Sequence, residues 1–179
     1  MSAPLAVGVL GARGLLGRAV VTAFTQAGHA VTAMRVDWSS ADAFAASARE
    51  PLRAFFETCA GPWALVWCAG AGFVGVDARI LETETACLAQ LLRLVRELRP
   101  PHRTPGVLFF SSSAGGVYGS SDELPLTESS AVCPVSAYGH AKLKQEQQLM
   151  AACDANSGLS LIVGRFSNLY GANQSAAKP

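Results

Sequence analysis

The stretch Ala6-Val7-Gly8-Val9-Leu10-Gly11-Ala12-Arg13-Gly14-Leu15-Leu16-Gly17 decides the fold of this 179-residue chain. Its apolar first half has the length and valine content of a buried strand, and a glycine turn ends it. Residues 15–27 follow with helical periodicity and a glycine stop at position 28. Residues 30–36 are apolar again and complete a unit of about the 30 residues typical of a strand–helix–strand crossover. The stretch therefore predicts the start of a parallel sheet.

The three glycines of the turn each meet a physical requirement. Gly11 permits a tight exit from the strand, Gly14 lets backbone approach a diphosphate, and Gly17 lets the helix pack near the sheet. The first amides of the helix then favour anionic phosphates. Because the glycines stand between a strand and a helix, they predict a dinucleotide-binding turn, although a glycine-rich turn without a ligand is the alternative. The residues expected to contact the cofactor here are Gly11, Arg13, Gly14, Leu15, Leu16 and Gly17.

Strand and helix signals alternate along the rest of the chain. Strands are expected over residues 64–69, 106–111 and 159–163, and helices over residues 80–98 and 138–152. A further helix is expected to begin at Ser39 or Asp42 and to be interrupted by Pro51. The alternation predicts an α/β fold: a Rossmann-type, doubly wound parallel sheet with helices on both faces, in a single domain over residues 1–179.

Composition excludes several other classes of protein. Half of the residues are hydrophobic and 15% are charged, which suits a sheet buried on both faces. A net charge of +1 without a basic run argues against a nucleic-acid partner. Five scattered cysteines without C-x-x-C spacing argue against a disulfide framework or a metal site. No apolar run approaches the roughly 20 residues of a membrane span, and the N-terminus is unlike a signal peptide, so a cytoplasmic location is expected.

Charges near the end of the second strand bear on the choice of cofactor. An acidic residue about 20 positions after the glycines binds the adenosine ribose of NAD, whereas an arginine favours the 2′-phosphate of NADP. Asp37 has the acidic spacing, but Arg35 lies nearer the expected strand end and Arg13 lies within the turn. Two cations outweigh one carboxylate, so NADP is favoured and NAD stays open.

A tyrosine and a lysine four positions apart offer acid–base chemistry. Tyr138 and Lys142 lie one helical turn apart and therefore on one face. A nearby ammonium favours a phenolate, which can then exchange a proton with a substrate. The serines at the end of an expected strand supply hydroxyls for a reacting oxygen. Alternatively, this spacing arises by chance on an exposed helix, and the serines only form a turn.

With these residues in place, the chain resembles the NAD(P)-dependent epimerase/dehydratase family, the extended branch of the short-chain dehydrogenase/reductase superfamily. The resemblance covers nearly the whole chain and rests on several short segments. They are the glycine turn, Trp67-Cys68-Ala69-Gly70, Ser111-Ser112-Ser113, Val117-Tyr118-Gly119, Tyr138-x-x-x-Lys142 and Arg165-Phe166-Ser167-Asn168-Leu169-Tyr170-Gly171.

The resemblance assigns roles to these positions. It implies that Tyr138 is the catalytic acid–base, that Lys142 holds the nicotinamide ribose and favours the phenolate, and that Ser113 positions the substrate oxygen. Ser112, which could take the place of Ser113, and Asn168 would face the substrate. The remaining cofactor contacts would come from Cys68, Ala69, Gly70, Ser111 and Phe166.

The resemblance also implies an activity and a small-molecule substrate. It indicates an oxidoreductase-type enzyme that acts on a nucleotide sugar or a related carbonyl or hydroxyl compound, as an epimerase, a dehydratase or a ketoreductase. An NAD(P)-binding module or redox sensor without turnover, or an inactive fragment, is the alternative. The family continues well beyond this length, so we expect a truncated chain in which the C-terminal substrate domain is largely absent. Relatives often pair through helices near the active site, so a homodimer is also expected.

Two positions depart from the family pattern. Members often carry an asparagine in the helix where this chain has Thr83-Glu84-Thr85. Arg35 stands where relatives that prefer NAD have an aspartate.

Overall fold

The computed structural model describes residues 4–70, 75–99, 105–121, 124–153, 157–171 and 174. In these residues, strands and helices alternate along most of the chain. The elements are β1 (Ala6–Leu10), α1 (Leu15–Gln26), β2 (Ala30–Met34), α2 (Ala41–Thr58), β3 (Trp63–Trp67), α3 (Ala78–Leu98), β4 (Gly106–Ser113), α4 (Ala114–Tyr118), α5 (Ala137–Ala152) and β5 (Leu159–Phe166).

The five strands form one parallel sheet in the order β2-β1-β3-β4-β5. The chain leaves β1 toward one edge of the sheet and later returns to pair β3 on the other side of β1, with Leu10 opposite Trp67. The carboxyl ends of β1 and β3 therefore flank the point where the winding reverses, which is where parallel α/β sheets bind ligands. The predicted doubly wound Rossmann-type sheet is confirmed.

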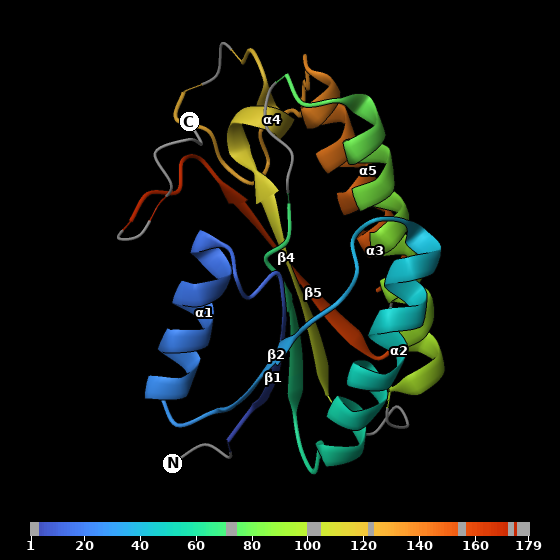
Figure 1. Cartoon of the computed structure of the whole chain (residues 1–179). Helices are drawn as coiled ribbons and strands as arrows, with labels where there is room; N and C mark the ends of the chain where they lie inside the picture. The colour runs from blue at the N-terminus through green and yellow to red at the C-terminus, as the bar shows by residue number, and fades with distance from the viewer. Residues whose placement is uncertain are drawn as a thin grey trace.

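Helices cover both faces of the sheet. Figure 1 shows α1 on one face and the row of α2, α3 and α5 on the other. Alternate strand residues point to the two faces, which gives two apolar cores of unequal size. The smaller core packs Val7, Val9 and Val66 against α1. The larger core lies beneath the row of three helices and includes the buried residues Leu10, Phe44, Leu52, Trp63, Leu65, Trp67, Leu88, Leu94, Leu108, Phe110 and Leu149.

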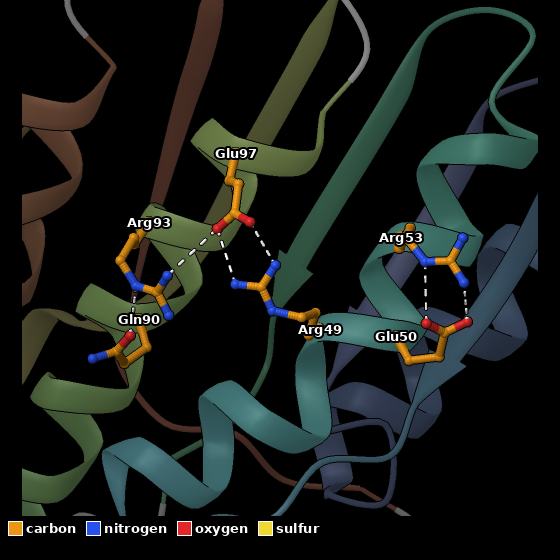
Figure 2. Close-up of polar contacts among 6 residues, drawn as sticks. All are labelled: Arg49, Glu50, Arg53, Gln90, Arg93 and Glu97. Atoms are coloured by element: carbon orange, nitrogen blue, oxygen red, sulfur yellow. Dashed lines mark hydrogen bonds and ion pairs between the residues drawn. The ribbon is translucent and has the colours of Figure 1, made fainter.

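Ionic contacts join the solvent-facing sides of α2 and α3 (Figure 2). The guanidinium of Arg49 on α2 donates two hydrogen bonds to the carboxylate of Glu97 on α3. Glu97 also accepts from Arg93 within its own helix. Because these side chains are about half exposed, water and salt weaken their attraction. They align the two helices, while the buried apolar contacts hold them together.

The second helix departs from the sequence prediction in two ways. Its N-cap is Ser40, whose side chain accepts a hydrogen bond from the amide of Ala43, and not Ser39 or Asp42. Pro51 lies inside α2 and does not interrupt it. Ala48 and Leu52 on either side of the proline are fully buried, so packing outweighs the lost backbone hydrogen bond and the steric cost of the ring.

Four strands end at residues other than those predicted. β3 stops at Trp67 instead of residue 69, and β5 continues beyond residue 163 to Phe166. β2 ends at Met34 and not at residue 36, so both Arg35 and Asp37 lie in the segment after the strand. β4 continues to Ser113, and the residues expected to form a loop after it make the short helix α4.

Candidate cofactor and catalytic site

A cavity of about 480 Å³ lies at the carboxyl ends of β1 and β3. Its walls combine the glycine turn, the segment after β2, the end of β3 and the first turns of α3. The lining residues are Gly11, Gly14, Trp38, Ser39, Cys68, Ala69, Gly70, Arg79, Ile80, Thr83, Glu84 and Cys87. This is the place where the strand order predicts a bound ligand.

Close packing requires glycine at two positions of the turn. Gly11 has a φ of +82°, and a Cβ there would lie 2.6 Å from the backbone nitrogen of Ala69. A Cβ on Gly17 would lie 2.2 Å from the carbonyl oxygen of Gly11. Side chains are therefore excluded where the turn touches β3 and where α1 begins. Gly14 instead lines the cavity, where the absence of a side chain leaves its backbone accessible to a ligand.

The N-terminus of α1 is open to an anion. It begins after Gly14 with no side-chain cap and no acidic residue in its first turn. In the described part of the chain, α2, α3 and α5 are capped by the side chains of Ser40, Asp77 and Ser136. The amides of Leu15 and Leu16 belong to the uncapped turn, and unpaired amides at a helix start attract phosphate. The turn therefore fits a diphosphate.

The segment after β2 reaches the cavity through residues that the sequence did not single out. Trp38 and Ser39 line the cavity, whereas Arg35 and Asp37 are exposed and do not. The carboxylate of Asp37 accepts a hydrogen bond of 2.8 Å from the amide of Ser39, and hydrogen bonds from Ser39 lower the pKa of that carboxyl. The indole of Trp38 packs against Trp67, with ring centroids 5.3 Å apart. The only feature of the sequence that could have identified Trp38 as a site residue is its large aromatic side chain just after a strand.

Arg13 lies at the surface of the glycine turn. Its side chain is exposed, and its carbonyl accepts a hydrogen bond of 2.9 Å from the guanidinium of Arg18.

Cys68 and Ala69, which were predicted to end β3, follow the strand, because it stops at Trp67. Cys68, Ala69 and Gly70 all line the cavity, and the amide of Cys68 donates a 2.9 Å hydrogen bond to Leu10. Burial raises the pKa of the Cys68 thiol to about 12. Burial, followed by the charge of Glu84, raises the pKa of the neighbouring cavity residue Cys87 to about 11. Both thiols are therefore uncharged at neutral pH.

Ser113, Tyr138 and Lys142 converge beyond the end of β4. The Ser113 hydroxyl caps α4 by accepting a 3.1 Å hydrogen bond from the amide of Gly116. A Cβ on Gly116 would lie 3.2 Å from both the Ser113 hydroxyl and the Tyr138 ring, so both side chains meet at this glycine. The Lys142 ammonium lies 5.9 Å from the centre of the Tyr138 ring. A Cβ on Gly139 would lie 2.1 Å from the Gly116 carbonyl, so α5 carries a glycine where it meets α4.

Lys142 has a buried partner that residue spacing did not predict. Its ammonium donates a 2.8 Å hydrogen bond to Oε1 of Glu84, and both side chains are buried. Gln145 donates to the same oxygen at 3.4 Å and to Thr85 at 3.1 Å. Glu84 belongs to α3, so this contact joins two helices that are far apart in sequence. The only sequence signal was the departure from the family asparagine in this helix.

The other serines lie nearby but face different surroundings. Ser112 is buried, and its hydroxyl donates to Glu146 on α5. Glu146 also receives two hydrogen bonds from Arg165, of 3.1 and 2.7 Å. Hydrogen bonding to Glu146 raises the pKa of the Arg165 guanidinium. Ser111 is half-buried in β4 beside Gly164. The structure thus engages Ser112 in a buried network and leaves Ser113 nearest to Tyr138.

The last two predicted site residues belong to β5 and the segment after it. Phe166 is paired in register with Ser113, and its ring lies 6.3 Å from that of Phe109. Asn168 is exposed two residues beyond the strand. Phe166 is therefore next to the catalytic candidates, while Asn168 lies farther out at the surface.

The described residues contain no group of three or more histidine, cysteine or acidic side chains placed to hold a metal ion. No helix in the same part of the chain combines the length and apolarity needed to cross a membrane.

Comparison with known proteins gives one family and a consistent set of relatives. A sequence profile of the NAD dependent epimerase/dehydratase family matches residues 7–179. The UDP-glucose 4-epimerase of Azospirillum brasilense is 37% identical over 62 residues, which cover 35% of this chain and 18% of that protein.

Solved structures share the fold over nearly the whole chain. The UDP-glucose 4-epimerase of Thermus thermophilus in complex with NAD matches with a TM-score of 0.75 and 22% identity, covering 94% of this chain and 57% of that one. RMD from Pseudomonas aeruginosa complexed with NADPH matches with a TM-score of 0.73 and 24% identity, covering 98% and 58%. The chain thus spans less than two thirds of these relatives. Since the profile match extends over most of its length, the chain belongs to the NAD dependent epimerase/dehydratase family.

Proposed function

We propose that residues 1–179 form the NAD(P)-binding domain of an oxidoreductase-type enzyme that acts on a nucleotide sugar or a related carbonyl or hydroxyl compound. One observation carries the proposal: Ser113, Tyr138 and Lys142 converge on the edge of the sheet that also carries the uncapped start of α1 and the 480 Å³ cavity. The names of the relatives support the substrate class, since the curated protein from Azospirillum brasilense is a UDP-glucose 4-epimerase.

The lining of the cavity suggests how a dinucleotide would be held. The backbone at Gly11 and Gly14, with the first amides of α1, would bind the diphosphate. Cys68, Ala69 and Gly70 would contact the adenosine side. The contacts on the nicotinamide side would come from Ser111, Tyr138, Lys142 and Phe166.

NADP is the cofactor that we propose, with NAD as the alternative. Arg35 and Arg13 are exposed cations on the two segments that contribute Ser39 and Gly14 to the cavity lining. The carboxylate of Asp37 is already engaged by the amide of Ser39. A 2′-phosphate would therefore meet two cations, whereas a ribose hydroxyl would compete with a local hydrogen bond.

The side chains of this chain would handle the proton and the substrate oxygen. A bound nicotinamide supplies reversible hydride transfer. Ser113 accepts from Gly116 and so keeps its own proton to donate to a substrate oxygen. Lys142 would stabilise Tyr138 as a phenolate, and the phenolate would then remove the proton of the substrate hydroxyl and become a neutral phenol. Ser112 and Asn168 are the remaining substrate-side candidates. Return of the hydride to the other face would give an epimerase, return after elimination a dehydratase, and a single transfer a ketoreductase.

Replacing the candidate acid–base tests the enzyme proposal. We expect Tyr138→Phe to abolish the conversion of UDP-glucose or of a carbonyl substrate, measured by chromatography, and to weaken NADPH binding, measured by fluorescence, by no more than about tenfold, as the loss of one hydrogen bond would. Tyr170→Phe is the matched control, because Tyr170 is 88% exposed and belongs to the segment after β5. If NADPH binds and Tyr138→Phe leaves turnover unchanged, the assigned catalytic role is wrong.

A cofactor-binding module without turnover is the second candidate function. It is favoured by the ion pair that commits Lys142 to Glu84. Tight NADPH binding by the wild-type chain, with no conversion of any nucleotide sugar or carbonyl compound, would support it. Gly14→Val should then fold normally and lose that binding, because a side chain would stand at the cavity wall.

We also propose that the chain forms a homodimer through α3 and α5. A groove of about 510 Å³ runs between their outer faces. Several small side chains line it, namely Ala78, Ala86, Ala137 and Ala141. Small residues let helices from two copies approach closely.

A further inference from the structure

Glu84 and Lys142 form an ion pair that is enclosed by protein. Their side chains are 7% and 5% exposed. Removing two charges from water is costly, and attraction repays the cost only when the remaining polar atoms also find partners. Oε1 of Glu84 has two donors, Lys142 and Gln145. Oε2 is buried and has no hydrogen-bond partner, so this carboxylate retains an unused acceptor.

The pair lies against the wall of the cavity. Both Glu84 and Gly70 line the cavity. A Cβ built on Gly70 would lie 3.7 Å from the Lys142 ammonium and 3.7 and 3.8 Å from the two carboxylate oxygens of Glu84. Gly70 has no side chain, so no Cβ at this position comes between the cavity and the ion pair.

Neighbouring residues fix the orientation of the carboxylate. The side-chain amide of Gln145 donates to both Thr85 and Oε1 of Glu84, at 3.1 and 3.4 Å. The Lys142 ammonium lies between the rings of Phe110 and Tyr138, 5.0 and 5.9 Å from their centres. These contacts engage Oε1 and leave Oε2 as the oxygen that can take a new donor.

We propose that Glu84 and Lys142 together bind the hydroxyl pair of a ribose, with Glu84 as an acceptor that the catalytic assignments do not include. The inference rests on the proposed cofactor-binding function and deepens it. A hydroxyl both donates and accepts, so it can donate to the carboxylate and accept from the ammonium. A phosphate only accepts and would be repelled by Glu84. The pair therefore selects an uncharged diol, and its position beside Tyr138 assigns that diol to the ribose on the nicotinamide side.

Two ligands isolate this contact by calorimetry. ADP-ribose carries the second ribose and lacks the nicotinamide, whereas ADP carries neither. We expect the wild-type chain to bind ADP-ribose more tightly than ADP. Glu84→Gln, which keeps the size and removes the charge, should weaken ADP-ribose binding roughly 10- to 100-fold, the range of a charge-assisted hydrogen bond. ADP binding should stay within about twofold.

Matched variants separate this role from a change in folding. Glu82→Gln removes the same charge from an exposed position on α3 and should leave both affinities unchanged. Glu84→Asp keeps the charge and withdraws the carboxylate by one methylene, so it should reproduce the selective loss of ADP-ribose binding even if Glu84→Gln does not fold.

The outcomes distinguish this inference from the proposed function. If Glu84→Gln folds and binds ADP-ribose as tightly as the wild type, or more tightly, Glu84 is only the structural counter-ion of Lys142 and the inference is overturned. Equal loss of ADP and ADP-ribose binding in Glu84→Asp would overturn it as well. If the wild-type chain binds neither ligand nor NADPH, the proposed function itself is wrong and the inference falls with it.

Discussion

Arg35 is the residue on which we expect the choice of cofactor to depend. It is exposed just after β2, while its neighbour Asp37 is engaged by the amide of Ser39. Arg35→Ala removes a charge-assisted contact worth about 1.5–3 kcal/mol. NADP binding should therefore weaken roughly 10- to 100-fold, and NAD binding much less, in parallel calorimetric titrations.

Arg96→Ala is the control for this change, because Arg96 is an exposed cation on α3 that does not line the cavity. Equal weakening of NAD and NADP binding by Arg35→Ala would contradict the proposed preference.

The cavity thiols should react slowly with electrophiles. Only the thiolate is nucleophilic, and burial raises the pKa of Cys68 to about 12 and contributes most to raising that of Cys87 to about 11. At pH 8 we expect iodoacetamide to label the exposed Cys133 far faster than either cavity cysteine, as followed by mass spectrometry of peptides. Labelling of Cys68 should rise about tenfold per pH unit as its thiolate fraction grows. Labelling of Cys68 as fast as Cys133 at pH 8 would show that the cavity is open or its thiol is ionised.

Among the helices and strands, α2 shows most clearly that tertiary packing can outweigh local helix propensity, because it contains Pro51. The proline lies inside this 18-residue helix, where it cannot donate the usual backbone hydrogen bond. Pro51→Ala restores that donor and a residue of high helix propensity, so we expect the free energy of unfolding to rise by about 1–3 kcal/mol in urea titrations. A loss of stability would mean that the pyrrolidine ring packs in a way that alanine cannot replace.

Local patterns in the sequence predicted most elements, and contacts between distant segments decided where the predictions failed. The glycine turn and the spacing of Tyr138 and Lys142 depend on neighbours within one turn, so they could be predicted from the sequence. The helix continues through Pro51 because the residues on either side of the proline are buried in the core. This burial depends on segments distant in the sequence, so local sequence patterns could not predict it. The pairing of Lys142 with Glu84 joins positions 58 residues apart, so spacing could not predict it. Trp38 reaches the cavity because β2 ends earlier than its apolar pattern suggests.

At the scale of the whole molecule, the two faces of the sheet are covered unequally. Three helices cover one face, whereas α1 alone, among the described helices, covers the other (Figure 1). Ile162 of β5 pairs in register with Phe109 on this second face and is 53% exposed. The outer faces of α3 and α5 carry the small-residue groove instead. The molecule thus has two surfaces through which copies could associate, one a sheet face and one a helix pair.

We expect the helix pair to form the dimer. Four of the ten residues that line the α3–α5 groove are alanines, and small side chains let helices of two copies pack closely. Ala141→Arg should place a long charged side chain there and convert particles of twice the 18.6 kDa chain mass into monomers, as measured by light scattering after size-exclusion chromatography. Ala54→Arg, at an exposed position on α2, should leave the mass unchanged. If Ile162→Lys separates the copies and Ala141→Arg does not, the dimer forms through the open sheet face, because only that surface contains Ile162.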